Sequence, residues 1–130
     1  MSDVHHVRHI LLVDDEVILQ DILRKMIERA RHQVIAASSG EEALEILKSQ
    51  PIDLVITDLY MPSMSGLDLL VSVKDSWPNI PVIIMSGRGP EARDSAVAAG
   101  ADDFIAKPFR SSEVLERVTL FANHANARVS

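Results

Sequence analysis

The sequence predicts a doubly wound α/β fold built on a five-stranded parallel sheet. Five short apolar runs recur along the chain, and Val and Ile, which favour strands, dominate them. Three of the runs are almost continuously apolar, as expected of strands that are covered on both faces. Segments with helical spacing of apolar residues separate the runs, so strand and helix alternate along the chain. Right-handed crossovers between parallel strands then give an open sheet with helices on both faces.

The first part of the chain contains two strand–helix units. The first strand is expected at His9–Val13, and a helix follows at Glu16–Ala30, where six apolar residues have helical spacing: Ile18, Leu19, Ile22, Leu23, Met26 and Ile27. The second strand is expected at Gln33–Ala37 and its helix at Glu41–Lys48.

The rest of the chain contains three more units. Their strands are expected at Asp53–Thr57, Pro81–Met85 and Asp102–Ala106. Ser65 opens the third helix, and Ser111 or Ser112, with Glu113 close behind, opens the last. The fourth helix, Pro90–Ala99, is rich in alanine and begins with a proline that suits a first helical turn. Because it carries little large apolar surface, we expect it to be the weakest helix.

Composition limits the class of protein. With 130 residues, 47% of them apolar and 25% charged, the chain suits one globular domain, expected at residues 8–122 between flexible ends at 1–7 and 123–130. A net charge of -6 argues against direct binding of nucleic acid. The lack of cysteine excludes thiolate zinc sites, and no apolar stretch matches a signal sequence or a membrane span. We therefore expect a cytoplasmic protein.

Candidates for chemistry follow four of the five predicted strands, all but the second, which ends in Ser38 and Ser39. The candidates are Asp14 and Asp15 after the first, Asp58 after the third, Ser86 after the fourth, and Lys107 with Pro108 after the fifth. Ligands of doubly wound folds bind at the carboxyl ends of the strands. If the first and third strands are neighbours, three carboxylates meet there beside a hydroxyl and an ammonium group.

Three carboxylates in contact repel one another unless a cation lies between them. Mg²⁺ fits best, because it takes one or two carboxylates and keeps several waters for phosphate oxygens to replace. A carboxylate beside Mg²⁺ can also be a nucleophile that forms an aspartyl phosphate. Asp58 is the best candidate, since it stands alone after an apolar strand and leads into a turn.

Four stretches, LLVDDE, DLVITDLYMPSMSGLDLL, PVIIMSG and GADDFIAKPF, occur in this order. Together they resemble the receiver domain of two-component response regulators, over about residues 8–122. The resemblance implies a flavodoxin-like (βα)5 three-layer sandwich with strand order 2-1-3-4-5. It also implies a signalling switch rather than an enzyme, although such a domain assists its own phosphotransfer and dephosphorylation.

The resemblance assigns a role to each site residue. Asp58 would accept a phosphoryl group from a histidine kinase or histidine phosphotransfer protein, and Lys107 would pair with its oxygens. Mg²⁺ would be held by Asp14, Asp15, Asp58 and the backbone carbonyl of Tyr60. Ser86 and Phe104 would be the switch pair, the ring turning inward on phosphorylation, and the Lys107–Pro108 peptide would be cis. The fourth helix, the fifth strand and the fifth helix would then control a downstream partner or output domain.

The chain departs from the commonest pattern at three positions. Ser86 replaces Thr, Phe104 replaces Tyr, and Gly87 replaces Ala, and none of these changes removes a phosphorylation group. By resemblance, Tyr60 and Arg88 set the lifetime of the phosphoryl group, and the bulky ring of Tyr60 predicts a long one.

Several alternatives stay open. A haloacid-dehalogenase-type phosphatase would need a second acid where Tyr60 stands, and a flavodoxin-like nucleotide binder would need a phosphate-binding loop in place of the acids. A scaffold would need none of the site residues. His5, His6 and His9 suggest a metal site, but no further ligand is arranged around them, so a solvated arm is expected. The chain is either a stand-alone regulator or part of a longer protein, and phosphorylation-linked dimerisation is a further alternative.

Overall fold

The structure, a computed structural model, describes residues 8–129, with side chains up to residue 121. The expected flexibility of residues 1–7, which include His5 and His6, therefore lies outside the described residues. Within them, no helix is long and apolar enough to cross a membrane.

Five parallel strands form one sheet in the order β2-β1-β3-β4-β5. Their bounds are β1 His9–Val13, β2 Gln33–Ala37, β3 Leu54–Asp58, β4 Val82–Ser86 and β5 Asp103–Ala106. Since β1 lies between β2 and β3, the strand order reverses beside β1. The predicted fold class and strand order are confirmed.

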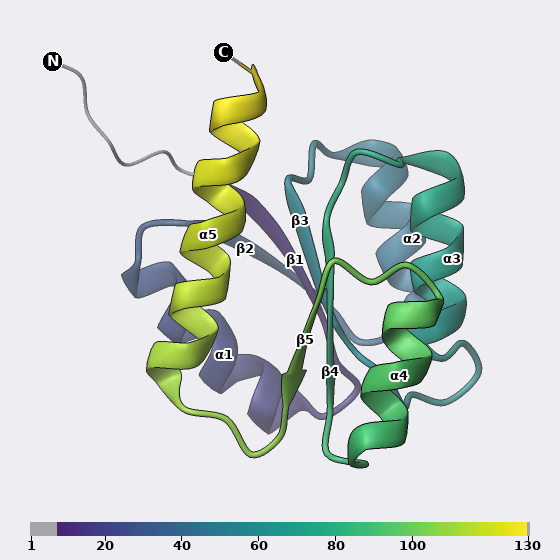
Figure 1. Cartoon of the computed structure of the whole chain (residues 1–130). Helices are drawn as coiled ribbons and strands as arrows, with labels where there is room; N and C mark the ends of the chain where they lie inside the picture. The colour runs from purple at the N-terminus through teal and green to yellow at the C-terminus, as the bar shows by residue number, and fades with distance from the viewer. Residues whose placement is uncertain (1–7, 130) are drawn as a thin grey trace, which may run out of the picture.

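Four helices connect the strands, a fifth follows β5, and together they cover both faces of the sheet (Figure 1). They are α1 Val17–Arg29, α2 Gly40–Ser49, α3 Gly66–Ser76, α4 Pro90–Ala98 and α5 Ser111–Val129. Helices α1 and α5 lie on one face, and α2, α3 and α4 lie on the other. The molecule is thus a three-layer sandwich, as predicted.

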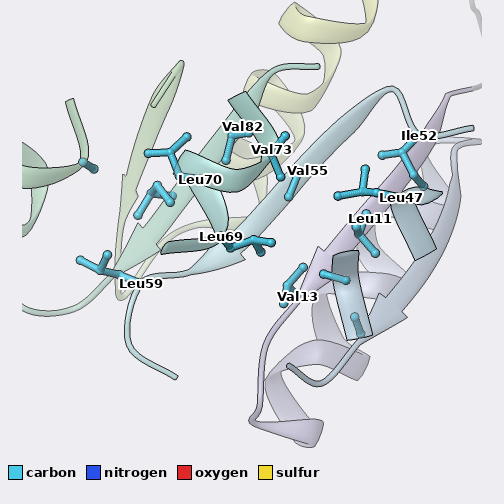
Figure 2. Packing of buried hydrophobic residues seen from close by; sticks show 14 of the residues in the cluster. Leu11, Val13, Leu47, Ile52, Val55, Leu59, Leu69, Leu70, Val73 and Val82 are labelled. Atoms are coloured by element: carbon cyan, nitrogen blue, oxygen red, sulfur yellow. The ribbon is translucent and has the colours of Figure 1, made fainter. Parts of the chain in front are cut away.

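Alternate strand residues belong to two separate cores, because successive side chains of a strand point to opposite faces. Leu11, Val13 and Val55 pack beneath α2 and α3 with Leu47 and Leu69 (Figure 2). The residues between them in the strands face α1 and α5; that core contains Ile10, Leu12, Ile56, Ile83, Met85 and Ile105, with Leu23, Ile27, Val114 and Val118 from the helices. The almost continuous apolar runs are explained by this burial on both faces.

The structure differs from the predicted boundaries by one residue at the ends of several elements and by more at the end of α5. The third and fourth strands begin and end one residue later than predicted, because the ladder continues through the pairs Asp58–Met85 and Ser86–Ala106. Asp58 and Ser86 are therefore the last residues of their strands. Helix α5 continues to Val129 rather than ending near residue 122, since its last turns contain several alanines and neither Pro nor Gly.

The apolar stripe of α1 is only partly buried. Leu23 and Ile27 face the core, whereas Val17, Ile18 and Ile22 are 65%, 78% and 52% exposed. Periodicity predicted the helix correctly, but it did not predict that these residues lie on the surface.

Candidate functional site

Three carboxylates converge where the reversal in strand order places the ends of β1 and β3 side by side. Asp14 and Asp15 follow β1, and Asp58 ends β3. One oxygen from each of the three residues lies within 4.8 Å of the others. Asp14 and Asp58 are buried, and Asp15 is exposed. The parallel pairing of β1 and β3 therefore forms the cluster that the sequence predicted.

Asp14 has one satisfied carboxylate oxygen and one that is not satisfied. Its Oδ1 accepts a hydrogen bond from the Glu16 backbone N–H at 2.9 Å. Its Oδ2 is fully buried and has no hydrogen-bond partner among the described residues. Burial raises the pKa of the Asp14 carboxyl, and the bond from Glu16 and the charge of Lys107 oppose this effect only in part. A buried oxygen without a donor is energetically costly, so it points to a missing cationic partner.

Among the described residues, Lys107 is the only cationic side chain shown in contact with this cluster. Its Nζ donates to Asp58 Oδ1 at 3.1 Å and lies 3.8 Å from Asp14 Oδ2. Burial still raises the pKa of the Asp58 carboxyl, although the hydrogen bond and the charge of Lys107 lower it. One ammonium group therefore does not balance three carboxylates. The Lys107–Pro108 peptide is cis, in agreement with the expectation.

The close approach of α3 fixes the position of Asp58. Gly66, the first residue of α3, lies so near the end of β3 that a Cβ there would be 2.3 Å from the Asp58 carbonyl oxygen. The Gly66 N–H donates to the Leu59 carbonyl at 2.7 Å. Ser65 and Asp68 form a reciprocal capping box that begins the helix immediately before this contact. The stretch SGLD therefore positions the strand end that carries Asp58.

Three predicted residues lie at or just after the ends of β4 and β3. Ser86 is buried at the end of β4, and its Oγ accepts a hydrogen bond from the Arg88 backbone N–H at 3.1 Å. The Arg88 guanidinium stacks on the Tyr60 ring at 4.4 Å from the ring centroid. The two residues expected to set the phosphoryl lifetime thus contact each other, which sequence alone did not indicate.

The Phe104 ring is already turned inward. It is 3% exposed and packs in the core beneath α4. The Arg93 guanidinium of α4 lies over it, 4.9 Å from the ring centroid. Two small buried residues of α4, Ala92 and Ala96, belong to the same core as the ring. The expected movement of this ring on phosphorylation stays a prediction.

The residues of the cluster fit a hard divalent cation. All the donors are carboxylate oxygens, and Asp14 carries the buried, unsatisfied Oδ2. Mg²⁺ and Ca²⁺ prefer such oxygens, whereas zinc prefers histidine and cysteine ligands. The exposure of Asp15 leaves one side open to water or to an incoming group.

Comparison with known proteins agrees with this site. Residues 10–119 match the family model of the response regulator receiver domain. Response regulator ORR11 of Oryza sativa is 41% identical over 110 residues, which are 82% of this chain and 75% of the relative. Response regulator SaeR of Staphylococcus epidermidis is 39% identical over 124 residues, 94% of this chain and 52% of the relative. The chain thus spans about half the length of SaeR, and 54% of ORR7 of Oryza sativa.

Solved structures show the same architecture. A CheY-like receiver domain protein of Methanospirillum hungatei superposes with a TM-score of 0.88 at 25% identity, covering 95% of this chain and 99% of that one. A receiver domain protein of Clostridium thermocellum gives a TM-score of 0.81 at 33% identity, covering 94% and 96%. NtrX of Brucella abortus matches with a TM-score of 0.88 at 29% identity, but only 28% of that longer chain is covered. With the fold, the acidic cluster and these matches in agreement, the chain belongs to the response regulator receiver domain family.

Proposed function

We propose that the chain is a phospho-accepting switch and that Asp58 is the phosphorylated residue. The observation that carries the proposal is the buried cluster of Asp14, Asp15 and Asp58, in which one Asp14 oxygen lacks a partner and Lys107 contacts Asp58 at 3.1 Å. An Asp58 oxygen attacks the phosphorus of the donor, the bond from phosphorus to the donor's histidine nitrogen breaks, and the imidazole takes up a proton.

Mg²⁺ would be held by Asp14, Asp15 and Asp58 with the Tyr60 backbone carbonyl, and when bound it neutralises charge on the transferred group. Lys107 would move its hydrogen bond from the Asp58 carboxylate to a phosphoryl oxygen. The Lys107 ammonium group is well placed for this, since its Nζ already donates to Asp58 Oδ1. The buried strand ends exclude water from one side of Asp58 and orient the attacking oxygen.

The switch would begin at Ser86. A phosphoryl group on Asp58 adds acceptor oxygens that draw the Ser86 hydroxyl towards it. Because Ser86 Oγ accepts the Arg88 N–H, this movement would shift residues 87–89 and the start of α4. Helix α4 is held by few large contacts, since its buried residues are Ala92 and Ala96. We therefore propose that the surface of α4, β5 and α5 changes and alters the binding of a downstream protein or output domain.

The donor protein would dock on the exposed apolar residues of α1. Val17, Ile18 and Ile22 are exposed in the first turns of α1, the helix that begins two residues after Asp15. Ile22 also lines a groove of about 370 Å³ between α1 and α5. Exposed apolar groups gathered beside a reactive carboxylate indicate a protein-binding surface. A histidine kinase or a histidine phosphotransfer protein would bring its phosphohistidine there.

Intact mass spectrometry tests the assignment of Asp58. The protein is incubated with Mg²⁺ and acetyl phosphate, alongside Asp58→Asn and the matched control Asp75→Asn, which changes an exposed aspartate of α3. We expect a gain of one phosphoryl group in the wild type and in Asp75→Asn, and none in Asp58→Asn or in EDTA. A gain in Asp58→Asn, or no gain in the wild type with either acetyl phosphate or a phosphorylated histidine phosphotransfer protein, would contradict the proposal.

A further inference from the structure

A glutamine on the buried side of α1 contacts the backbone that carries the acidic pair. Gln20, Leu23 and Ile27 are spaced by three and four residues, so they lie on one side of the helix, and Leu23 and Ile27 are core residues. A polar amide on such a stripe costs free energy unless its groups form hydrogen bonds. An apolar residue at position 20 would be the simpler solution for packing alone.

The Gln20 amide bonds to the ends of two strands. Its Nε2 donates to the Asp14 carbonyl at 3.1 Å and to the Ala37 carbonyl at 2.9 Å. The Ala37 carbonyl also accepts the Asp14 backbone N–H at 3.1 Å. Gln20 therefore joins the last residue of β2 to the residue that follows β1, at the point where the regular ladder between Val13 and Ala37 ends.

These bonds fix the peptide plane between Asp14 and Asp15. The Asp14 carbonyl belongs to this plane, and the side chains of Asp14 and Asp15 leave the backbone on either side of it. The Asp14 carboxylate is also aligned by the bond from the Glu16 N–H to its Oδ1, which leaves Oδ2 in the cluster. A rotation of this plane would move two of the three carboxylates together.

We propose that Gln20 is a positioning residue for the cation site, holding Asp14 and Asp15 in the geometry that binds Mg²⁺. The inference rests on the proposed function, since it concerns the same site. Gln20 does not touch the cation; it acts through the Asp14 backbone. Partners that orient metal ligands in this way typically contribute about 10-fold to 100-fold in metal affinity.

The test compares three substitutions by methionine. Gln20→Met keeps the length of the side chain and removes both donors. Gln33→Met makes the same chemical change at an exposed strand position. Arg117→Met breaks the ion pair between α5 and Asp103 at the start of β5, so it perturbs the fold at the far end of that strand from Lys107. Mg²⁺ affinity is measured by calorimetric titration, and exchange of the Asp14 amide is measured by NMR in EDTA.

We expect Gln20→Met to raise the Mg²⁺ dissociation constant about tenfold and to speed exchange of the Asp14 amide in the metal-free protein. Gln33→Met and Arg117→Met should change neither the Mg²⁺ dissociation constant nor the exchange rate of the Asp14 amide, even if Arg117→Met lowers the melting temperature. If Gln20→Met does not fold, Gln20→Asn keeps the uncharged amide on a side chain one methylene shorter, which cannot hold both carbonyls, and it should also weaken binding.

Two results would overturn the inference: Mg²⁺ affinity and Asp14 exchange in Gln20→Met equal to those of the wild type, or an equal loss of affinity in Arg117→Met, which would indicate a general effect of stability. A wild-type protein that binds no Mg²⁺ would instead contradict the proposed function. In that case the Asp14 exchange rate in EDTA would still decide whether Gln20 holds this backbone.

Discussion

Replacing Gly66 by alanine should both destabilise the fold and displace Asp58. The new Cβ would lie 2.3 Å from the Asp58 carbonyl oxygen and 2.8 Å from the Leu59 Cα, where real Cβ contacts are essentially never under 3.0 Å. Both obstacles are backbone atoms, so β3 and α3 must separate by at least the missing 0.7 Å. Separation also weakens the 2.7 Å bond from the Gly66 N–H to the Leu59 carbonyl.

The expected cost follows from these two losses. Overpacking of a close contact costs about 1 to 3 kcal/mol, and a lost hydrogen bond costs about 1 kcal/mol. We therefore expect Gly66→Ala to lower the free energy of unfolding by about 3 kcal/mol and the melting temperature by about 10 °C. Since a misplacement of about 1 Å can cost about 100-fold in rate, phosphorylation by acetyl phosphate should slow at least roughly tenfold.

Gly40→Ala is the matched control. Gly40 is the first residue of α2, as Gly66 is of α3, but its Cβ would meet the Met64 side chain, at 2.6 Å from Sδ. A flexible thioether can move aside, so we expect a change within about 1 kcal/mol. The assays are urea denaturation and the phosphorylation time course by intact mass. If Gly66→Ala is as stable and as rapidly phosphorylated as Gly40→Ala, the steric argument is refuted.

Four further predictions concern the acidic cluster and its surroundings. Burial raises the pKa of Asp58 above its ordinary 3.8, so the metal-free folded state binds protons more readily than the unfolded chain. In EDTA, the free energy of unfolding should therefore fall as the pH rises from 3.8 through the folded-state pKa. Asp58→Asn should be more stable than the wild type at neutral pH, and its stability should fall less with pH, as measured by urea denaturation. Ile18→Asp should abolish phosphorylation by a protein donor while leaving the rate with acetyl phosphate within about twofold of the wild type, because only docking is changed. Tyr60→Asn should shorten the phosphoryl lifetime several-fold, since it removes the ring that Arg88 covers, as followed by decay of the phosphorylated mass. Hydrogen exchange should be faster in α4 than in α1, and Arg93→Ala, which uncovers the Phe104 ring, should speed it further in α4.

Each of these predictions has a contrary outcome. Equal pH slopes for the wild type and Asp58→Asn would show that burial of this carboxyl does not control the pH dependence. If Ile18→Asp slows phosphorylation by both donors equally, or by neither, the proposed docking surface is contradicted. A wild-type phosphoryl group that decays as fast as that of Tyr60→Asn would remove the role of the ring. Protection of α4 equal to that of α1 would contradict the expected mobility.

Much of the site followed from the order of residues alone. A continuous apolar run needs cover on both faces, and parallel strands bring their carboxyl ends to one edge, so the acids after the runs were bound to gather there. The same reasoning predicted Ser86 and Lys107 at this edge, and the structure places Ser86 at the end of β4 and Lys107 in contact with Asp58. These conclusions depend only on periodicity and chain direction, which are local properties.

Other features depend on distances between elements that are far apart in sequence. Nothing in the pattern indicated that Arg93 covers Phe104, that Arg88 stacks on Tyr60, or that Gln20 bonds to Asp14 and Ala37. The sequence offered one indication of the role of Gln20, a polar residue among the apolar positions of α1. That indication is informative only once the structure shows which side of α1 faces the core. The exposure of Ile18 could not be predicted for a similar reason: helical spacing shows which residues share one side of a helix, but not how many of them are buried.

The sequence by itself determined the alternation of strand and helix and the edge of the sheet where the acids meet, and it supplied the candidates for the reacting groups. Only the tertiary structure decided the bonds from Gln20 to the ends of two strands, the unsatisfied oxygen of Asp14, and the inward position of the Phe104 ring. The physical reason is that backbone preferences and periodicity act over a few residues, whereas desolvation and side-chain contacts depend on how the whole chain packs.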